Sequence, residues 1–225
     1  MLASAADREW EGFAGATFPG LYAMIANDYM HRYPLTREQL AQVAVKNHEN
    51  GARNPIAQFK NRITIDTVLN SSLVADPLRL FDCSPITDGA AAVVVVPLER
   101  AREFTDSPVR VLASAQASDT IALHDRRDIS TLDATVAAGK RAFAQAGLAQ
   151  KDIDLVEVHD CFTIAEICAI EDLGFCRKGE AAQFVGGGRI GLGGELPLNT
   201  AGGLLSEGYI HGWNLIAEGV RQIRG

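Results

Sequence analysis

The stretch VEVHDCFTIAEICAIEDLGFC, residues 156–176, gives the strongest indication of the fold. It begins as the end of a short strand, and residues 162–173 are mostly apolar, as expected of a buried helix. Open α/β sheets bind ligands where a strand ends, which is here at His159, Asp160 and Cys161. Because alternate side chains of an extended chain point the same way, His159 and Cys161 could both face a pocket. The alternative is a histidine and a thiol that both pack in the core.

The neighbouring segments continue this alternation of strands and helices. A helix is expected over 131–147, a final helix within 204–224, and strands at 90–96, 108–113, 152–158 and 195–199. The run from Ala90 to Val96 is continuously apolar, which predicts a strand buried on both faces. The pattern favours an α/β layered fold with a mixed sheet covered by helices.

The first ninety residues read differently, as helices and loops. We expect a helix over 21–33, stopped by Pro34, and a second that starts at Thr36 with a capping box and ends near Gly51. Residues 63–69 are β-branched and alternating, which predicts a short strand or extended arm. This region is therefore expected to be a helical and loop insertion on the sheet, and residues 98–108 are the best internal boundary.

A second dense motif is LNTAGGLLSEGYIHGWN at 198–214. Its small residues, such as Gly202 and Gly203, allow the backbone to approach a ligand closely. Tyr209 and His211 are polar aromatic residues beside a predicted helix start. The alternative is a tight turn in which Tyr209 is packed. The glycines at 186–191 match GxGxxG formally, but they lie in a loop that leads to a strand rather than a helix, which disfavours a nucleotide site.

The overall composition excludes several classes of protein. The balance of 21 basic and 28 acidic residues gives a net charge of −7, which disfavours nucleic-acid binding. Only a small basic surface patch is expected, with Lys46 and Arg53 among its members. No apolar run is long enough for a membrane span. The four cysteines form no CxxC pair, so we expect free thiols in the cytoplasm and no metal site.

The two motifs together resemble those of the thiolase superfamily, in the branch of the sterol-carrier-protein-type thiolases and their lipid-transfer-protein-like relatives. KNHENGARNP at 46–55 and CSPITDGAAAVVVV at 83–96 resemble the same group. The resemblance implies that residues 1–98 are the remainder of the N-terminal half and that 99–225 form an incomplete C-terminal half. It also implies that the cysteine nucleophile of that family lies upstream of this chain.

The resemblance also assigns roles to particular residues. Tyr209 stands where the family has the histidine of its GHPxG motif, and His211 follows two residues later. In retro-aldolase relatives a pair of tyrosines acts instead; Tyr209 matches the second of them and His159 stands at the first. We therefore predict His159, Tyr209 and His211 as catalytic residues. The predicted substrate-binding residues are Asn199, Gly202, Gly203, Ser206 and Cys161.

Three functions follow from the resemblance. The first is an acyltransferase that makes or breaks a carbon–carbon bond next to the thioester of an acyl-CoA. The second is a retro-aldolase of steroid or other acyl-CoA thioesters that needs no covalent intermediate, and the third is a non-catalytic acyl-CoA-binding subunit. The expected setting is lipid or sterol side-chain metabolism. Coenzyme A enters as part of the substrate and no separate cofactor is expected. Expected partners are a second copy of the chain and a small protein with an OB-like domain.

Overall fold

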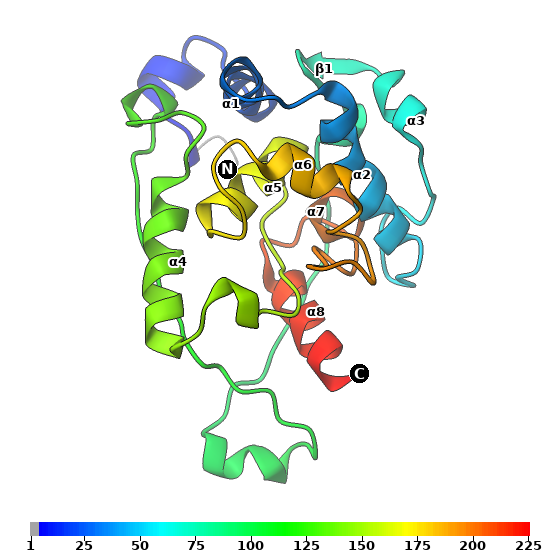
Figure 1. Cartoon of the computed structure of the whole chain (residues 1–225), viewed down its shortest axis with the longest axis vertical. Helices are drawn as coiled ribbons and strands as arrows, with labels where there is room; N and C mark the ends of the chain where they lie inside the picture. Colours follow the sequence, from blue (N-terminus) through cyan, green and yellow to red (C-terminus); the bar gives the residue numbers. More distant parts are fainter. Residues whose placement is uncertain (1–4) are drawn as a thin grey trace.

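The computed structural model describes residues 5–225, and its helices gather around one central helix (Figure 1). That helix is α5, Thr163–Asp172, which packs against α1, α2, α4 and α6. The helices around it are α1 (Phe18–Arg32), α2 (Arg37–Gly51), α3 (Ile65–Leu69), α4 (Asp133–Ala146), α6 (Ala181–Gly186), α7 (Gly203–Ser206) and α8 (Trp213–Arg224). A short π-helical segment occupies Arg8–Gly12, and short 3₁₀-helical segments occupy Leu80–Asp82, Leu98–Glu103, Leu123–Asp125 and Gln150–Asp152.

Helix α5 is central, and its residues from Thr163 to Glu171 are all buried. Ile164, Ile167 and Ile170 are completely buried and supply much of its apolar surface. The buried acidic residues of α5 each need a partner: Glu166 pairs with Lys46, and Glu171 pairs with Lys178. The helix predicted over 162–173 is confirmed, and its environment explains its composition.

The predicted start and stop signals of the other helices are largely confirmed. Thr36 caps α2, accepting a bond from the Gln39 amide while the Gln39 side chain accepts one from the Thr36 amide. Helix α4 ends at Gly147, whose φ of 68° is left-handed and suits glycine. The strand predicted at 63–69 is wrong. Its residues form α3 instead, because Thr64 and Thr67 form a reciprocal capping box that begins a helix there.

The expected sheet is much reduced within the described residues. The sheet that forms is two-stranded and antiparallel, with β1 (Leu73–Ala75) and β2 (Leu78–Arg79). Of the strands expected at 152–158 and 195–199, one parallel bridge forms, between Val156 and Leu198. These segments thus lie beside one another, but their pairing does not extend beyond this single bridge.

The segments 90–96 and 108–113 form no strand in the described structure. They run extended toward the lobe at Leu98–Glu103, at the bottom of Figure 1. Val94 and Val95 are 84% and 78% exposed, so the prediction of a strand buried on both faces is wrong for this structure. The physical reason is that a strand is buried by neighbouring strands and covering helices, and no described element supplies them here.

Candidate active site

Three polar aromatic side chains lie in a row at the surface. Nε2 of His159 and the hydroxyl of Tyr209 are 3.0 Å apart, within hydrogen-bonding distance. The Tyr209 ring meets the rings of His159 and His211 edge to face, with centroids 5.4 and 5.2 Å apart. His159 and His211 are exposed, and Tyr209 is half-buried between them. The structure therefore brings together the three side chains that the sequence predicts as catalytic.

A short parallel pairing of Val156 with Leu198 places the segment that carries His159 beside the segment that leads to Tyr209. Val156 donates its N–H to the Pro197 carbonyl and accepts one from the Asn199 amide, at 2.9 and 3.0 Å. The Asn199 side chain then accepts the Val158 N–H at 2.8 Å. Asn199 is completely buried, so its contacts in this structure are with the protein itself. It fixes the end of the segment that carries His159.

The buried Asp160 links the segment that carries His159 to helices α7 and α2. Its buried carboxylate accepts the Leu204 N–H at 2.8 Å and a bond from the Asn47 amide. A side chain at Gly203 would place its Cβ 2.2 Å from an Asp160 oxygen, and Gly203 has a φ of 60°. The glycine is thus required by close packing and by its backbone conformation.

The other predicted substrate-binding residues are also packed inside the protein. A Cβ at Gly202 would lie 2.9 Å from the Gly51 Cα, and a Cβ at Gly51 would lie 2.1 Å from the Ser206 hydroxyl. That hydroxyl donates to the Phe59 carbonyl. Cys161 belongs to the core, so the alternation with His159 does not bring both side chains to the surface. Their role toward a substrate stays a prediction.

A buried ion pair joins the elements beneath the site. The Lys46 ammonium lies 2.7 Å from the Glu166 carboxylate and also donates to the Leu198 carbonyl. Glu166 accepts a further bond from the Asn199 side chain at 3.1 Å. Helices α2 and α5 and the loop before α7 are therefore held by one polar network. The expectation that Lys46 contributes to a basic surface patch is wrong, because its charge is needed inside.

The electrostatics give the two central residues opposite tendencies. The protein packed around the His159 ring partly desolvates it, although the side chain reaches solvent, and this lowers its pKa. The neighbouring His211 lowers it further, and the lowered pKa favours the neutral imidazole near pH 7. Burial raises the pKa of Tyr209, helped by Cys161 and Asp160, so its phenol keeps its proton. Two titratable groups shifted in this way are suited to act as base and acid.

The four cysteine thiols are poor nucleophiles. Burial raises the pKa to about 12 for each thiol: Cys83, Cys161, Cys168 and Cys176. A thiol attacks as the thiolate, which is scarce near pH 7 at such values. The chemistry that these residues themselves support is therefore proton transfer by His159 and Tyr209.

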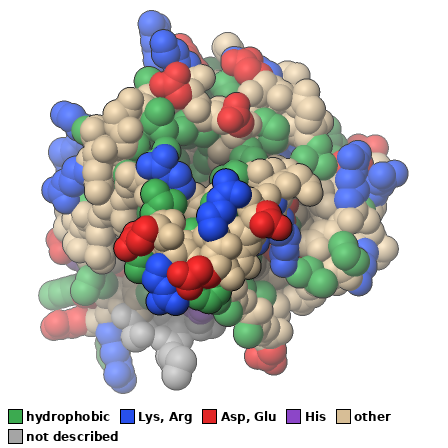
Figure 2. Space-filling view, turned by 90° about the horizontal axis from the view of Figure 1, so that it is seen from below, with side chains coloured by type: hydrophobic (Ala, Val, Ile, Leu, Met, Phe, Trp, Pro, Cys, Tyr) green, Lys and Arg blue, Asp and Glu red, His purple; other side chains and the backbone are tan. Residues whose placement is uncertain are grey.

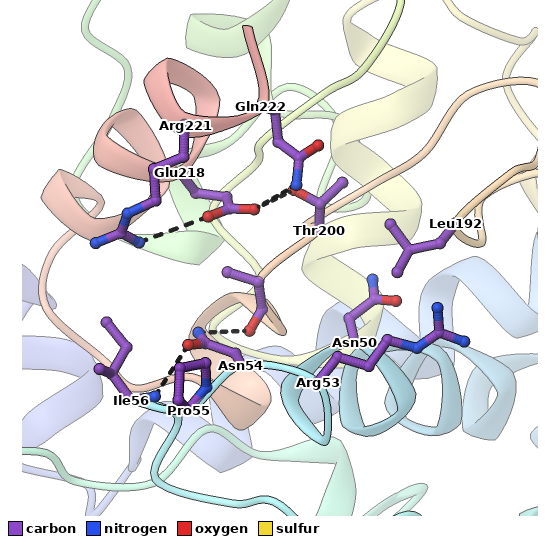
Figure 3. A pocket seen from close by; sticks show the side chains of 11 residues that line it. Asn50, Arg53, Asn54, Pro55, Ile56, Leu192, Thr200, Glu218, Arg221 and Gln222 are labelled. Atoms are coloured by element: carbon purple, nitrogen blue, oxygen red, sulfur yellow. Dashed lines mark hydrogen bonds and ion pairs between the residues drawn. The ribbon is translucent and has the colours of Figure 1, made fainter. Parts of the chain in front are cut away.

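A separate cavity of about 440 Å³ lies between α2, α8 and the loop before α7 (Figure 3). Its lining includes Arg53 and Arg221, and it does not include the histidine–tyrosine pair. At its wall the Thr200 hydroxyl is 2.8 Å from carboxylate oxygens of both Glu157 and Glu218. One hydroxyl donates one proton, so the second contact needs a protonated carboxyl group. Burial accordingly raises the pKa of Glu157 to about 7.

Over residues 5–225 no group of three or more His, Cys, Asp or Glu side chains is arranged to hold a metal ion. In the same range no helix is long and apolar enough to cross a membrane. Figure 2 shows basic side chains interspersed with acidic ones across one face.

Sequence reasoning did not predict the contacts that hold the site together. Thr87 contacts Tyr209, and Lys46, Asn47, Asp160 and Glu166 form a buried network. The one available signal was the set of acidic residues within the apolar stretch 160–172, because a buried charge requires a partner.

Comparisons with known proteins match this architecture. Residues 9–99 match the family described as "Thiolase, N-terminal domain", and residues 115–225 match "Thiolase C-terminal domain-like". An acetyl-CoA acetyltransferase of Methanothermobacter thermautotrophicus is 56% identical over 100% of this chain and 59% of its own length. The sterol carrier protein 2 of Gallus gallus is 32% identical over 95% of this chain and 41% of its own length.

A solved structure shares the fold. The structure described as "Ltp2-ChsH2(DUF35) aldolase" superposes with a TM-score of 0.91 at 39% identity, over 95% of this chain and 58% of that one. The chain belongs to the thiolase superfamily, in the branch of the sterol-carrier-protein-2-type thiolases. It has a thiolase-like α/β fold, and it spans a little over half the length of the similar enzymes. The proposed division at residue 98 stays a prediction.

Proposed function

We propose that this chain is part of an enzyme that breaks or forms a carbon–carbon bond next to the thioester of an acyl-CoA, with His159 and Tyr209 as its acid–base pair. The 3.0 Å contact between these two side chains, at an accessible position, carries the proposal. The names of the similar proteins, an acetyl-CoA acetyltransferase and an aldolase, support the same substrate class and bond.

The pair is best suited to aldol cleavage of a β-hydroxyacyl thioester. Neutral His159 accepts the proton of the β-hydroxyl group, and the bond between Cα and Cβ breaks to leave a carbonyl product. The electron pair moves into the thioester as an enolate, to which Tyr209 donates its proton. The raised pKa of Tyr209 makes it a donor rather than a base. No covalent intermediate is needed, which agrees with four protonated thiols.

Thiolase-type acyl transfer is the second candidate, and the 56% identity to an acetyl-CoA acetyltransferase favours it. In that case the nucleophile is a cysteine outside these 225 residues. His211 or His159 would then act as the base that activates it. A non-catalytic acyl-CoA-binding subunit stays as a third candidate.

We also propose that the working enzyme is an assembly. The aldolase with the similar fold is described together with ChsH2(DUF35), which supports a second protein as partner. A homodimer and a cytoplasmic location complete the proposal.

The test uses the complete enzyme with a β-hydroxyacyl-CoA and a β-ketoacyl-CoA as alternative substrates. Tyr209→Phe and His159→Ala should each lower turnover of the β-hydroxy substrate by about 10²–10⁴-fold. His211→Ala should cost much less, and the exposed His31→Ala is the matched control. Wild-type rates in Tyr209→Phe with a large loss in His211→Ala would contradict the aldolase. A stable acyl-enzyme seen by intact mass would favour the second candidate.

A further inference from the structure

The segment from Cys83 to Gly89 passes beside both parts of the active site. Cys83 forms an isolated bridge with Phe162, and Ser84 donates its N–H to the Cys161 carbonyl at 3.0 Å. At its other end a Cβ on Gly89 would lie 2.8 Å from the Ile210 side chain. The segment therefore touches the chain just after His159 and the chain just after Tyr209.

Thr87 makes the contact with Tyr209 itself. Its hydroxyl accepts the Tyr209 backbone N–H at 3.0 Å and lies 2.6 Å from the Gln58 side-chain oxygen, to which it donates. Its methyl group lies 3.0 Å from where a Cβ on Gly208 would stand. Both branches of the threonine are thus in use, one for hydrogen bonding and one for packing.

Gln58 closes this arrangement into a ring. Its backbone N–H donates to the Glu207 carbonyl at 2.9 Å, while its side chain accepts from Thr87. The turn from Glu207 to Tyr209 is therefore held from two sides. Gly208 within it has a φ of 150°, a conformation that favours glycine.

We propose that Thr87 is a positioning residue that sets the Tyr209 phenol against His159. The inference rests on the proposed function for its catalytic consequence. Tyr209 stands on a turn between α7 and α8, and its N–H is bonded through this one hydroxyl. A shift of about 1 Å in a reacting group lowers rates by about 10²-fold. Loss of the Thr87 hydroxyl frees the turn while leaving the phenol chemically intact.

The experiment compares three variants in the full chain and the complete enzyme. Thr87→Val keeps the methyl group and loses the hydroxyl, and Thr87→Ser does the reverse. Thr135→Val on α4 is the matched control. We expect the Tyr209 amide to exchange with deuterium at least about 10-fold faster in Thr87→Val, and at a near wild-type rate in the other two. Turnover should fall by about 10–10²-fold in Thr87→Val, and Thr87→Ser should restore most of it.

A double-mutant cycle separates positioning from general destabilisation. If Thr87 acts through Tyr209, Thr87→Val should cause no further loss of turnover in a Tyr209→Phe background. Full additivity of the two losses, or unchanged exchange of the Tyr209 amide in Thr87→Val, would overturn the inference. If Tyr209→Phe retains full turnover, the proposed function fails, and the amide exchange alone then decides whether Thr87 holds Tyr209.

Discussion

The loops that hold His159 and Tyr209 and the extended segment at 89–97 have equally little regular secondary structure, but they differ in burial and in hydrogen bonding. The loops around Asp160 and Asn199 are buried, and side chains bond their backbone. The backbone of residues 89–96 makes no hydrogen bond within the described structure, and Val94 and Val95 face solvent. The site loops are therefore held by hydrogen bonds and burial, without a helix or a strand.

The comparison also separates two kinds of apolar sequence. Residues 162–173 and residues 90–96 are both rich in hydrophobic side chains, but only the first group is surrounded by other elements. An extended segment with free backbone groups and exposed valines invites pairing with another strand. Substitutions in the two regions should consequently have very different effects.

The largest effect is expected from breaking the buried ion pair under the site. Lys46→Met leaves the Glu166 carboxylate buried without its counter-charge, which should lower the free energy of unfolding by about 3–5 kcal/mol. The exposed Lys60→Met makes the same chemical change and should cost less than about 0.5 kcal/mol. Urea denaturation of both variants checks this. Equal midpoints would mean that the network does not stabilise the site.

The pH dependence of stability tests the carboxyl groups that share Thr200. The raised pKa of Glu157, about 7, means that the folded protein keeps a proton that the unfolded chain loses near pH 4.5. The stabilisation is fully present below about pH 4.5 and is lost as the pH rises through about 7.

The loss amounts to at most about 3.5 kcal/mol, by the linkage of about 1.4 kcal/mol per pKa unit. Glu157→Gln should flatten the thermal stability profile between these pH values, whereas the exposed Glu99→Gln should leave it unchanged. If the stability of the wild type rises with pH over this window, and Glu157→Gln has the same profile, the raised pKa of Glu157 is contradicted.

The smallest effect on folding is expected in the extended segments. Val94→Thr should change stability by less than about 0.5 kcal/mol, because the side chain already faces water. The same substitution at the completely buried Val43 in α2 should cost about 1–3 kcal/mol. Light scattering should also show less self-association for Val94→Thr. A large loss of stability at Val94 would show that the segment is covered in solution.

Much of the helical structure was predictable, because its signals are local. The capping box at Thr36, the stop at Gly147 and the apolar run of α5 specify their elements within a few residues. At 63–69 the β-branched residues favour a strand, but the helix cap at Thr64 decides the conformation. The strand at 90–96 could not be judged locally, since whether it is buried depends on partners distant in sequence.

The sequence by itself determined the helices and, through its two motifs, the residues that meet at the candidate site: His159, Tyr209 and His211. Tertiary structure alone decided how these side chains face one another, which thiols are buried, and that Lys46 lies inside rather than at the surface. It also decided that Thr87 reaches Tyr209 across more than a hundred residues. The physical reason is that local spacing fixes backbone conformation, whereas pKa values, ion pairs and contact distances depend on what the folded chain brings into a common environment.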